Sequence, residues 1–228
     1  MACKRQVTST TSAVAITVEN FPDSNLRSFL LAQPYGTDSL LTDEEIAATT
    51  SLNLSGLDIS DLTGIQHFTA LKDLACVGNQ LTTLDIAGLT SLNYLNCASN
   101  QLTELHLTDL PTLNYLDCGQ NRLVTLDLIH LPSLHVLSCP DNQLTTLDFS
   151  HNPSITTVIC CGNQLHTQAI DTLISSLPHN ATNISHSLYL CNSQKTDEQN
   201  TCTPQQVATA KSKGWTTYHY TAKDWQKY

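Results

Sequence analysis

A fixed interval of 21 residues dominates the middle of this chain and constrains its fold more than any other feature. Cysteine recurs at this interval, at Cys76, Cys97, Cys118, Cys139 and Cys160. Asparagine recurs just after each cysteine, at Asn79, Asn100, Asn121, Asn142 and Asn163. An aliphatic residue recurs just before each cysteine, at Leu74, Leu95, Leu116, Leu137 and Val158. Copies of one pattern at a constant period predict an array of units that share one structure.

A single unit of this length cannot bury its own apolar side chains, so neighbouring units must stack into one continuous core. The segment Leu74-Ala75-Cys76 alternates apolar and other residues as a short strand does. Stacking places such strands side by side in a parallel sheet, with Leu74 and Cys76 pointing inward. We expect Asn79 and its equivalents to offer their side-chain amides to backbone groups that the turn after the strand leaves unpaired.

The repeat unit L-x-x-L-x-C-x-x-N-x-L-T-x-L-D-L resembles that of the internalin-like bacterial cell-surface leucine-rich-repeat proteins. The flanking passages F-P-D-S-N-L-R-S-F-L, L-T-D-E-E-I and G-W-T-x-Y resemble the caps of the same group. This resemblance covers roughly residues 18–228. It implies an α/β leucine-rich-repeat solenoid, a right-handed superhelix or horseshoe with a parallel sheet on its concave side. It also implies a non-catalytic binding protein exposed at the cell surface.

The chain divides into four predicted regions, which are a disordered leader (1–17), a helical N-terminal cap (18–50), the repeats (51–166) and a C-terminal repeat with its cap (167–228). Thr42 with Glu45, and Thr203 with Gln206, have the spacing of capping boxes, which begin helices. Thr167 is a candidate N-cap of a further helix. Residues 33–39 lie where related caps carry an acidic loop, but they contain too few carboxylates for calcium.

The composition excludes two classes of partner. The formal net charge of −10 argues against nucleic acid and anionic membrane surfaces, which both need basic patches. No apolar run approaches the length of a membrane span. The five periodic cysteines are expected to be buried hydrophobic residues rather than a disulfide framework or metal ligands. Cys191 and Cys202 lie outside the period, and a bridge between them stays open.

The location of the protein rests on the resemblance, which favours export or attachment to the cell surface. Ala2-Cys3 could be the end of a lipobox, with Cys3 the acylated residue of a lipoprotein, or simply part of a flexible tail. Because buried thiols tolerate either compartment, the cysteine content leaves a cytoplasmic location open. We expect a monomer.

Catalytic and metal sites are not predicted, and no cofactor is expected. The chain has no nucleophile elbow, zinc-binding helix motif or phosphate-binding glycine loop. Cys161 is expected at an outward strand position, but no neighbour supplies the lowered pKa that a reactive thiol needs. A column of Asp85, Asp127 and Asp148 could hold cations between coils, but His106 interrupts it, and a solvated convex face explains it better.

The outward side chains of the concave strands are the candidate binding site. Tyr94 and Tyr115 are expected to neighbour each other, with Asn96 and Asp117 beside them and only small residues around the pair. Tyrosine offers a large contact area with a polar tip, which suits recognition, although paired aromatic residues also stabilise sheets without any ligand. The complete set of candidate residues is Asp73, Tyr94, Asn96, Tyr115, Asp117, Ser138, Ile159 and Tyr189.

Three functions fit this candidate site. The first is a binding module for a protein ligand, extracellular or from a host. The second is a glycan-binding accessory protein, in which the tyrosines stack on sugar rings while Asn96 and Asp117 bond to hydroxyls. The third is a structural spacer with no specific ligand.

Overall fold

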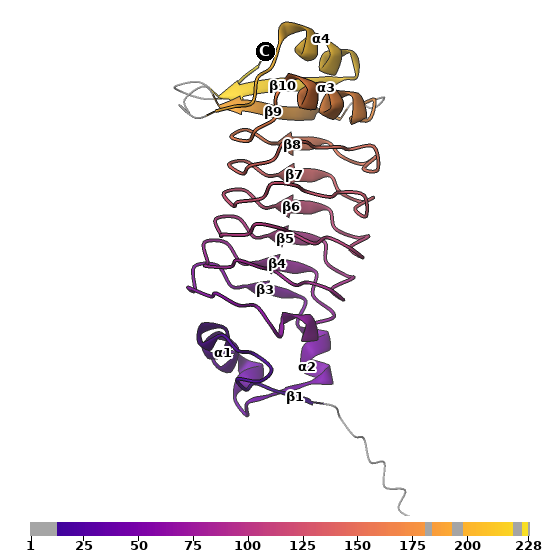
Figure 1. Ribbon diagram of the computed structural model, residues 1–228. Helices are drawn as coiled ribbons and strands as arrows, with labels where there is room; N and C mark the ends of the chain where they lie inside the picture. The colour runs from indigo at the N-terminus through magenta and orange to yellow at the C-terminus, as the bar shows by residue number, and fades with distance from the viewer. Residues whose placement is uncertain (1–12, 181–183, 193–197, 221–224, 228) are drawn as a thin grey trace, which may run out of the picture.

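The computed structural model describes residues 13–180, 184–192, 198–220 and 225–227. It forms an elongated stack of coils between two caps (Figure 1). Its order is β1(Ala13–Ala15), α1(Ser24–Leu31), η1(Pro34–Gly36), β2(Leu40–Thr42), α2(Asp43–Ala48), β3(Ser51–Asn53), η2(Ile65–His67), β4(Asp73–Ala75), β5(Tyr94–Asn96), β6(Tyr115–Asp117), β7(Val136–Ser138), β8(Thr157–Ile159), α3(Thr167–Ser176), β9(His186–Asn192), α4(Pro204–Ser212), β10(Trp215–Tyr220) and β11(Trp225–Lys227).

The predicted parallel sheet is confirmed. Strands β3 to β10 are parallel neighbours in chain order, and β11 pairs antiparallel with β10 at the far edge. The register follows the repeat, because Leu74 lies opposite Leu95, and Leu95 opposite Leu116. The first interval is one residue longer, and Leu52 still lies opposite Leu74. The inward leucines and cysteines of these strands form one continuous buried core.

The asparagine ladder, defined as the five periodic asparagines, has the structural role predicted for it. Asn121 shows the pattern: its Oδ1 accepts the Leu102 N–H at 3.0 Å, and its Nδ2 donates to the carbonyls of Cys97 and Cys118 at 3.1 Å each. Each asparagine therefore binds its own turn to the preceding coil. The bonded backbone groups are buried, where an unpaired group costs about 1–3 kcal/mol.

The N-terminal cap contains more structure than the helices that the sequence predicts. Strand β1 pairs antiparallel with β2, so the expected disordered leader is wrong for Ala13–Ala15. Val14 explains the difference, because its side chain is partly buried against the core. The capping box of Thr42 and Glu45 is confirmed at the start of α2.

The C-terminal cap covers the last coil with two helices, α3 and α4, and three strands, β9 to β11, among the described residues. Helices α3 and α4 lie together at the end of the stack, beside β9 and β10 (Figure 1). The capping box of Thr203 and Gln206 is confirmed, whereas Thr167 is the first helical residue and His166 is the N-cap. The short strand β11 has no counterpart in the sequence prediction. No described helix is long and apolar enough to cross a membrane.

Candidate functional site

The candidate site lies on the outward face of the sheet, where two rows of side chains cross the strands. The first row is the set of residues that begin the strands: Asp73, Tyr94, Tyr115, Val136 and Thr157. The second row begins two residues further along each strand: Ala75, Asn96, Asp117, Ser138, Ile159 and Tyr189. The parallel register therefore brings all eight predicted site residues onto one face, in two lines rather than one cluster.

Tyr94 and Tyr115 stack on each other at the centre of the first row. Their ring centroids lie 4.6 Å apart and the ring planes differ by 12°. This separation matches the spacing of adjacent strands, about 4.8 Å, so the register alone places the rings in contact. Both side chains are half-buried. They combine a fixed aromatic surface with phenol groups that remain partly accessible.

Asn96 and Asp117 flank the tyrosines, and each has a structural bond as well. The Asn96 Nδ2 donates to the Tyr94 hydroxyl at 3.3 Å, and its Oδ1 accepts the Ala98 N–H at 3.1 Å. The Asp117 Oδ1 accepts the Gly119 N–H at 3.0 Å. Burial raises the pKa of the Tyr115 phenol, and the nearby charge of Asp117 raises this pKa further. Tyr115 therefore stays a neutral hydrogen-bond donor over the physiological range.

Two predicted properties of this face are wrong. Ser138 is only 7% exposed, so it lies in the row but is not accessible to a ligand. The small residues around the tyrosine pair were expected to leave it exposed, but both tyrosines are half-buried, and Gly119, one of these small residues, is itself buried. A Cβ added at Gly119 would lie 2.8 Å from Pro140 Cδ, which shows that the Pro140 ring covers this position.

A second tyrosine stack lies at the C-terminal end of the second row. Tyr189 and Tyr218 have ring centroids 4.7 Å apart and planes that differ by 13°. Tyr189 also lies opposite Ile159 of the preceding strand. Tyr218 was not among the predicted residues, because it lies outside the period. The pairing of β10 with β9 places the Tyr218 ring against Tyr189.

The cysteines are structural. The five periodic thiols are buried in the core, and burial raises the pKa of Cys76 to about 12 and that of Cys97 well above its ordinary value. Cys161 was expected to be exposed, but it is only 5% exposed. A thiol that is covered from solvent is a poor nucleophile.

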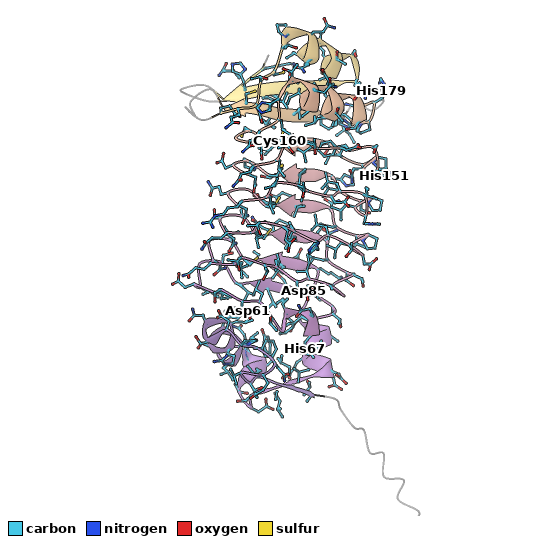
Figure 2. The ribbon with its side chains drawn as sticks, in the orientation of Figure 1. Asp61, His67, Asp85, His151, Cys160 and His179 are labelled. Atoms are coloured by element: carbon cyan, nitrogen blue, oxygen red, sulfur yellow. The ribbon has the colours of Figure 1, made fainter. Side chains whose placement is uncertain are left out.

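Acidic and histidine side chains form no metal centre in the part of the chain that the structure describes. In the aspartate column, Asp85, Asp127 and Asp148 each accept the N–H of the residue two positions later, at 3.0, 2.9 and 2.8 Å. These bonds close local turns, which explains the column without a cation. Asp85 and His151 lie in different coils, and His67 and His179 near opposite ends (Figure 2).

Comparison with known proteins assigns the architecture. The model of the leucine-rich-repeat domain of endo-beta-N-acetylglucosaminidase EndoS matches residues 21–152, more than half of the chain. The chain belongs to this leucine-rich-repeat family. The match concerns the repeat domain of that enzyme, and the repeats described above are its counterpart.

Internalins of Listeria monocytogenes are also similar to this leucine-rich-repeat chain. Internalin J of serotype 4b (strain F2365) is 39% identical over 69 residues, which are 29% of this chain and 7% of that protein. The solved functional domain of internalin J, described as including a cysteine ladder, has a TM-score of 0.57 and 30% identity. That match covers 74% of this chain and 42% of the solved one.

A third similarity shows the fold alone. The internalin InlF from Listeria monocytogenes has a TM-score of 0.67 at 20% identity, over 90% of this chain and 57% of that one. This leucine-rich-repeat chain thus covers 42% of the solved internalin J domain, 57% of the solved InlF and 7% of internalin J of strain F2365. Its architecture is similar to that of the internalins.

Proposed function

We propose that this chain is a non-catalytic module that holds a protein ligand on its concave face. The observation that carries the proposal is the half-buried Tyr94–Tyr115 stack. Tyrosine is enriched among the residues that contribute most to protein–protein binding. Because each ring fixes the other and both sit on rigid strands, little side-chain entropy is lost when a partner binds. Asp73 is exposed in the same row and adds a charge that can select a basic partner.

The geometry of the stack favours a protein over a glycan. A sugar ring stacks on a free aromatic face, but one face of each tyrosine is already covered by the other ring. The remaining faces point along the first row, toward Asp73 on one side and Val136 on the other. The ring edges and hydroxyls suit the mixed apolar and polar surface of a protein better than the flat face of a sugar.

The proposed location is outside the cytoplasm, at the bacterial cell surface, and similarity to internalins supports it. Attachment through Cys3 stays a prediction, since Cys3 lies outside the described residues, and so does the expected monomer. Fractionation of native cells would test the location. Finding the protein only in the cytosolic fraction would refute export.

The test of the binding function is a screen against immobilised extracellular proteins and a glycan array. It compares the wild type with a Tyr94→Ala/Tyr115→Ala variant. The control is Val124→Ala/Ile129→Ala, which removes two exposed apolar side chains that lie outside the strands of the sheet. Circular dichroism and thermal unfolding would first establish that both variants fold.

The proposal predicts a protein ligand that the central variant binds at least tenfold more weakly and that the control variant retains. A ligand that both variants retain would move the site away from the tyrosines. Binding to glycans alone would favour an accessory role in sugar recognition. If no ligand binds the wild type, the structural spacer becomes the better account.

A further inference from the structure

The N-terminal edge of the sheet is open, and it borders a pocket. Among the described residues, strand β3 is the edge strand of the nine-stranded sheet, and it pairs only with β4. Figure 1 shows β3 at the end of the stack, facing the helices of the N-terminal cap. An edge strand presents a line of backbone groups that can pair with another chain.

The hydrogen bonds around β3 show which of its backbone groups face this edge. The Asp73 N–H donates to the Thr50 carbonyl at 3.1 Å, and the Leu54 N–H donates to the Ala75 carbonyl at 2.7 Å. Thr50 and Leu54 therefore point toward β4. Since backbone direction alternates along a strand, the N–H and C=O groups of Ser51 and Asn53 point away from β4. Ser51 and Asn53 lie about 6.6 Å apart along the strand. An added strand forms its hydrogen bonds at this spacing.

A pocket of about 730 Å³ runs beside this edge. Phe29 of α1, Pro34 and Tyr35 of η1, and Ala48 of α2 form its walls, and Leu52 of β3 also lines it. The volume is within the range of binding pockets, about 300–1,000 Å³, and the mixture of apolar walls and nearby backbone groups is typical of them. It accommodates a bulky apolar side chain next to an extended backbone.

The hydroxyl of Tyr35 is an unsatisfied polar group in the pocket wall. It is buried, and no described residue forms a hydrogen bond with it. Burial also raises the pKa of the Tyr35 phenol, so it stays a donor. The hydroxyl oxygen is covered by protein, so a ligand in the pocket contacts other atoms of Tyr35.

The charge around the pocket is negative. Asp43, Glu44 and Glu45 form the first turn of α2, the helix that contributes Ala48 to the wall. Asp73 begins the strand beside β3 and is exposed. Lys72 is the one basic residue next to them in the sequence, so the local balance stays acidic. A ligand with lysine or arginine beside its apolar side chain is the electrostatic complement.

We propose that this pocket binds an extended peptide segment of a partner protein. The segment adds to β3 as a further strand, places a bulky apolar side chain between Phe29, Pro34 and Ala48, and carries flanking basic residues toward α2. This mode, in which main-chain bonds supply affinity and a pocket supplies specificity, is an established way to recognise peptides. The site is separate from the tyrosine stacks, and its test does not depend on the concave-face proposal.

The test uses a panel of synthetic hexapeptides that differ in one central residue, Leu, Ile, Phe, Tyr or Trp, with lysine on both sides. Binding to the ¹⁵N-labelled full chain is followed by the amide resonances of Ser51 and Asn53. The expected result is a saturable shift of both resonances. Replacing the flanking lysines by glutamate, or methylating alternate peptide nitrogens so that they cannot donate, should weaken binding at least tenfold.

Two variants one residue apart provide the matched control. Ala48→Trp fills the pocket from an exposed helix position, whereas Ala47→Trp adds the same side chain at a neighbouring exposed position that does not line it. We expect at least tenfold weaker binding for Ala48→Trp and unchanged binding for Ala47→Trp. Equal affinities for the two variants, or no shift at Ser51 and Asn53 with any peptide of the panel, would overturn the proposal.

The chain's own N-terminal segment is the other occupant that the test distinguishes. Removing residues 1–12 should leave the peptide affinity unchanged if the pocket serves a partner. If the peptides bind only after this removal, the pocket belongs to residues 1–12, and the proposal of a partner peptide is wrong.

Discussion

The repeat array and the C-terminal cap both use asparagine side chains to bond the buried backbone groups of neighbouring coils, but the asparagines lie at different sequence intervals. In the array, Asn163 accepts the Leu144 N–H and donates to the carbonyls of Cys139 and Cys160. In the cap, Asn200 accepts the Leu165 N–H at 2.9 Å and donates to the carbonyls of Cys160 and Leu190 at 2.8 Å each. Asn200 thus continues the asparagine ladder, although it lies 37 residues after Asn163 rather than 21.

The two tyrosine stacks on the outer face of the sheet can be compared in the same way. Tyr94 and Tyr115 are one period apart, whereas Tyr189 and Tyr218 are 29 residues apart. The separations of their ring centroids nevertheless differ by only 0.1 Å, at 4.6 and 4.7 Å. Strand register therefore determines the contact, and the sequence interval reveals it only where every coil has the same length.

The largest expected loss of stability follows from replacing the asparagines of the ladder and of the cap. Asn121→Ala in the array and Asn200→Ala in the cap should each lower the free energy of unfolding by about 1–3 kcal/mol, because each leaves buried backbone groups unpaired. Denaturant unfolding measures both, with Asn96→Ala on the outer face as a control of smaller effect. A negligible loss at Asn200 alone would break the equivalence of cap and array.

Asn79, the asparagine of the first coil, can be compared with Asn121 in the same way. Asn79 and Asn121 are equally exposed, at 8% each, and Asn79 accepts the N–H groups of both Leu57 and Ile59. A smaller cost at Asn79 would follow only if that end were more hydrated, and the exposures give no sign of this. We therefore expect Asn79→Ala to cost as much as Asn121→Ala.

A smaller effect is expected at the turns after the strands. Gly78 and Gly162 both have left-handed backbones, with φ of +65° and +68°, but a Cβ at Gly78 has no atom within 4 Å, whereas at Gly162 it would lie 2.1 Å from Asp141 Oδ1. Gly78→Ala should cost about 1–2 kcal/mol for the backbone alone. Gly162→Ala should cost more, because the Asp141 carboxylate must move. Thermal unfolding of both variants measures this, and equal losses would show that Asp141 adapts freely.

The smallest effect is a pH dependence confined to the cap. Burial lowers the pKa of His186, whose ring meets Trp215 edge-on with centroids 4.8 Å apart. Because the folded cap binds this proton less readily than the unfolded chain, stability should be constant above about pH 6.5 and fall as the pH drops from there toward the lower folded pKa. Unfolding midpoints measured across this range test it. His186→Phe should remove this part of the dependence, and an unchanged dependence would contradict the assignment.

Most of the array follows from the sequence because its contacts repeat. Leu74, Cys76 and Asn79 recur at one interval, so their inward or turn positions could be predicted from periodicity and strand alternation alone. The outward positions of Tyr94 and Tyr115 follow from the same alternation. Ser138 shows the limit of this reasoning, since alternation predicts the direction of a side chain but not what covers it.

The caps could be predicted only in part, because their decisive contacts join residues at irregular separations. Local signals predicted the helices that begin at Asp43 and Pro204, where a side chain bonds to backbone three residues away. Asn200 and Tyr218 had no such signal. Their roles depend on the return of the chain through α3 and α4, which no local pattern specifies.

Hydrogen exchange at two matched amides tests the equivalence of cap and array most directly. The Leu165 N–H donates to Asn200 Oδ1, as the Leu123 N–H does to Asn142 Oδ1. Both amides should be strongly protected in the wild type. Asn200→Ala should speed exchange at Leu165 by at least tenfold and leave Leu123 unchanged. If Leu165 stays as protected as Leu123 in this variant, Asn200 does not continue the ladder, and the cap holds the last coil by other contacts.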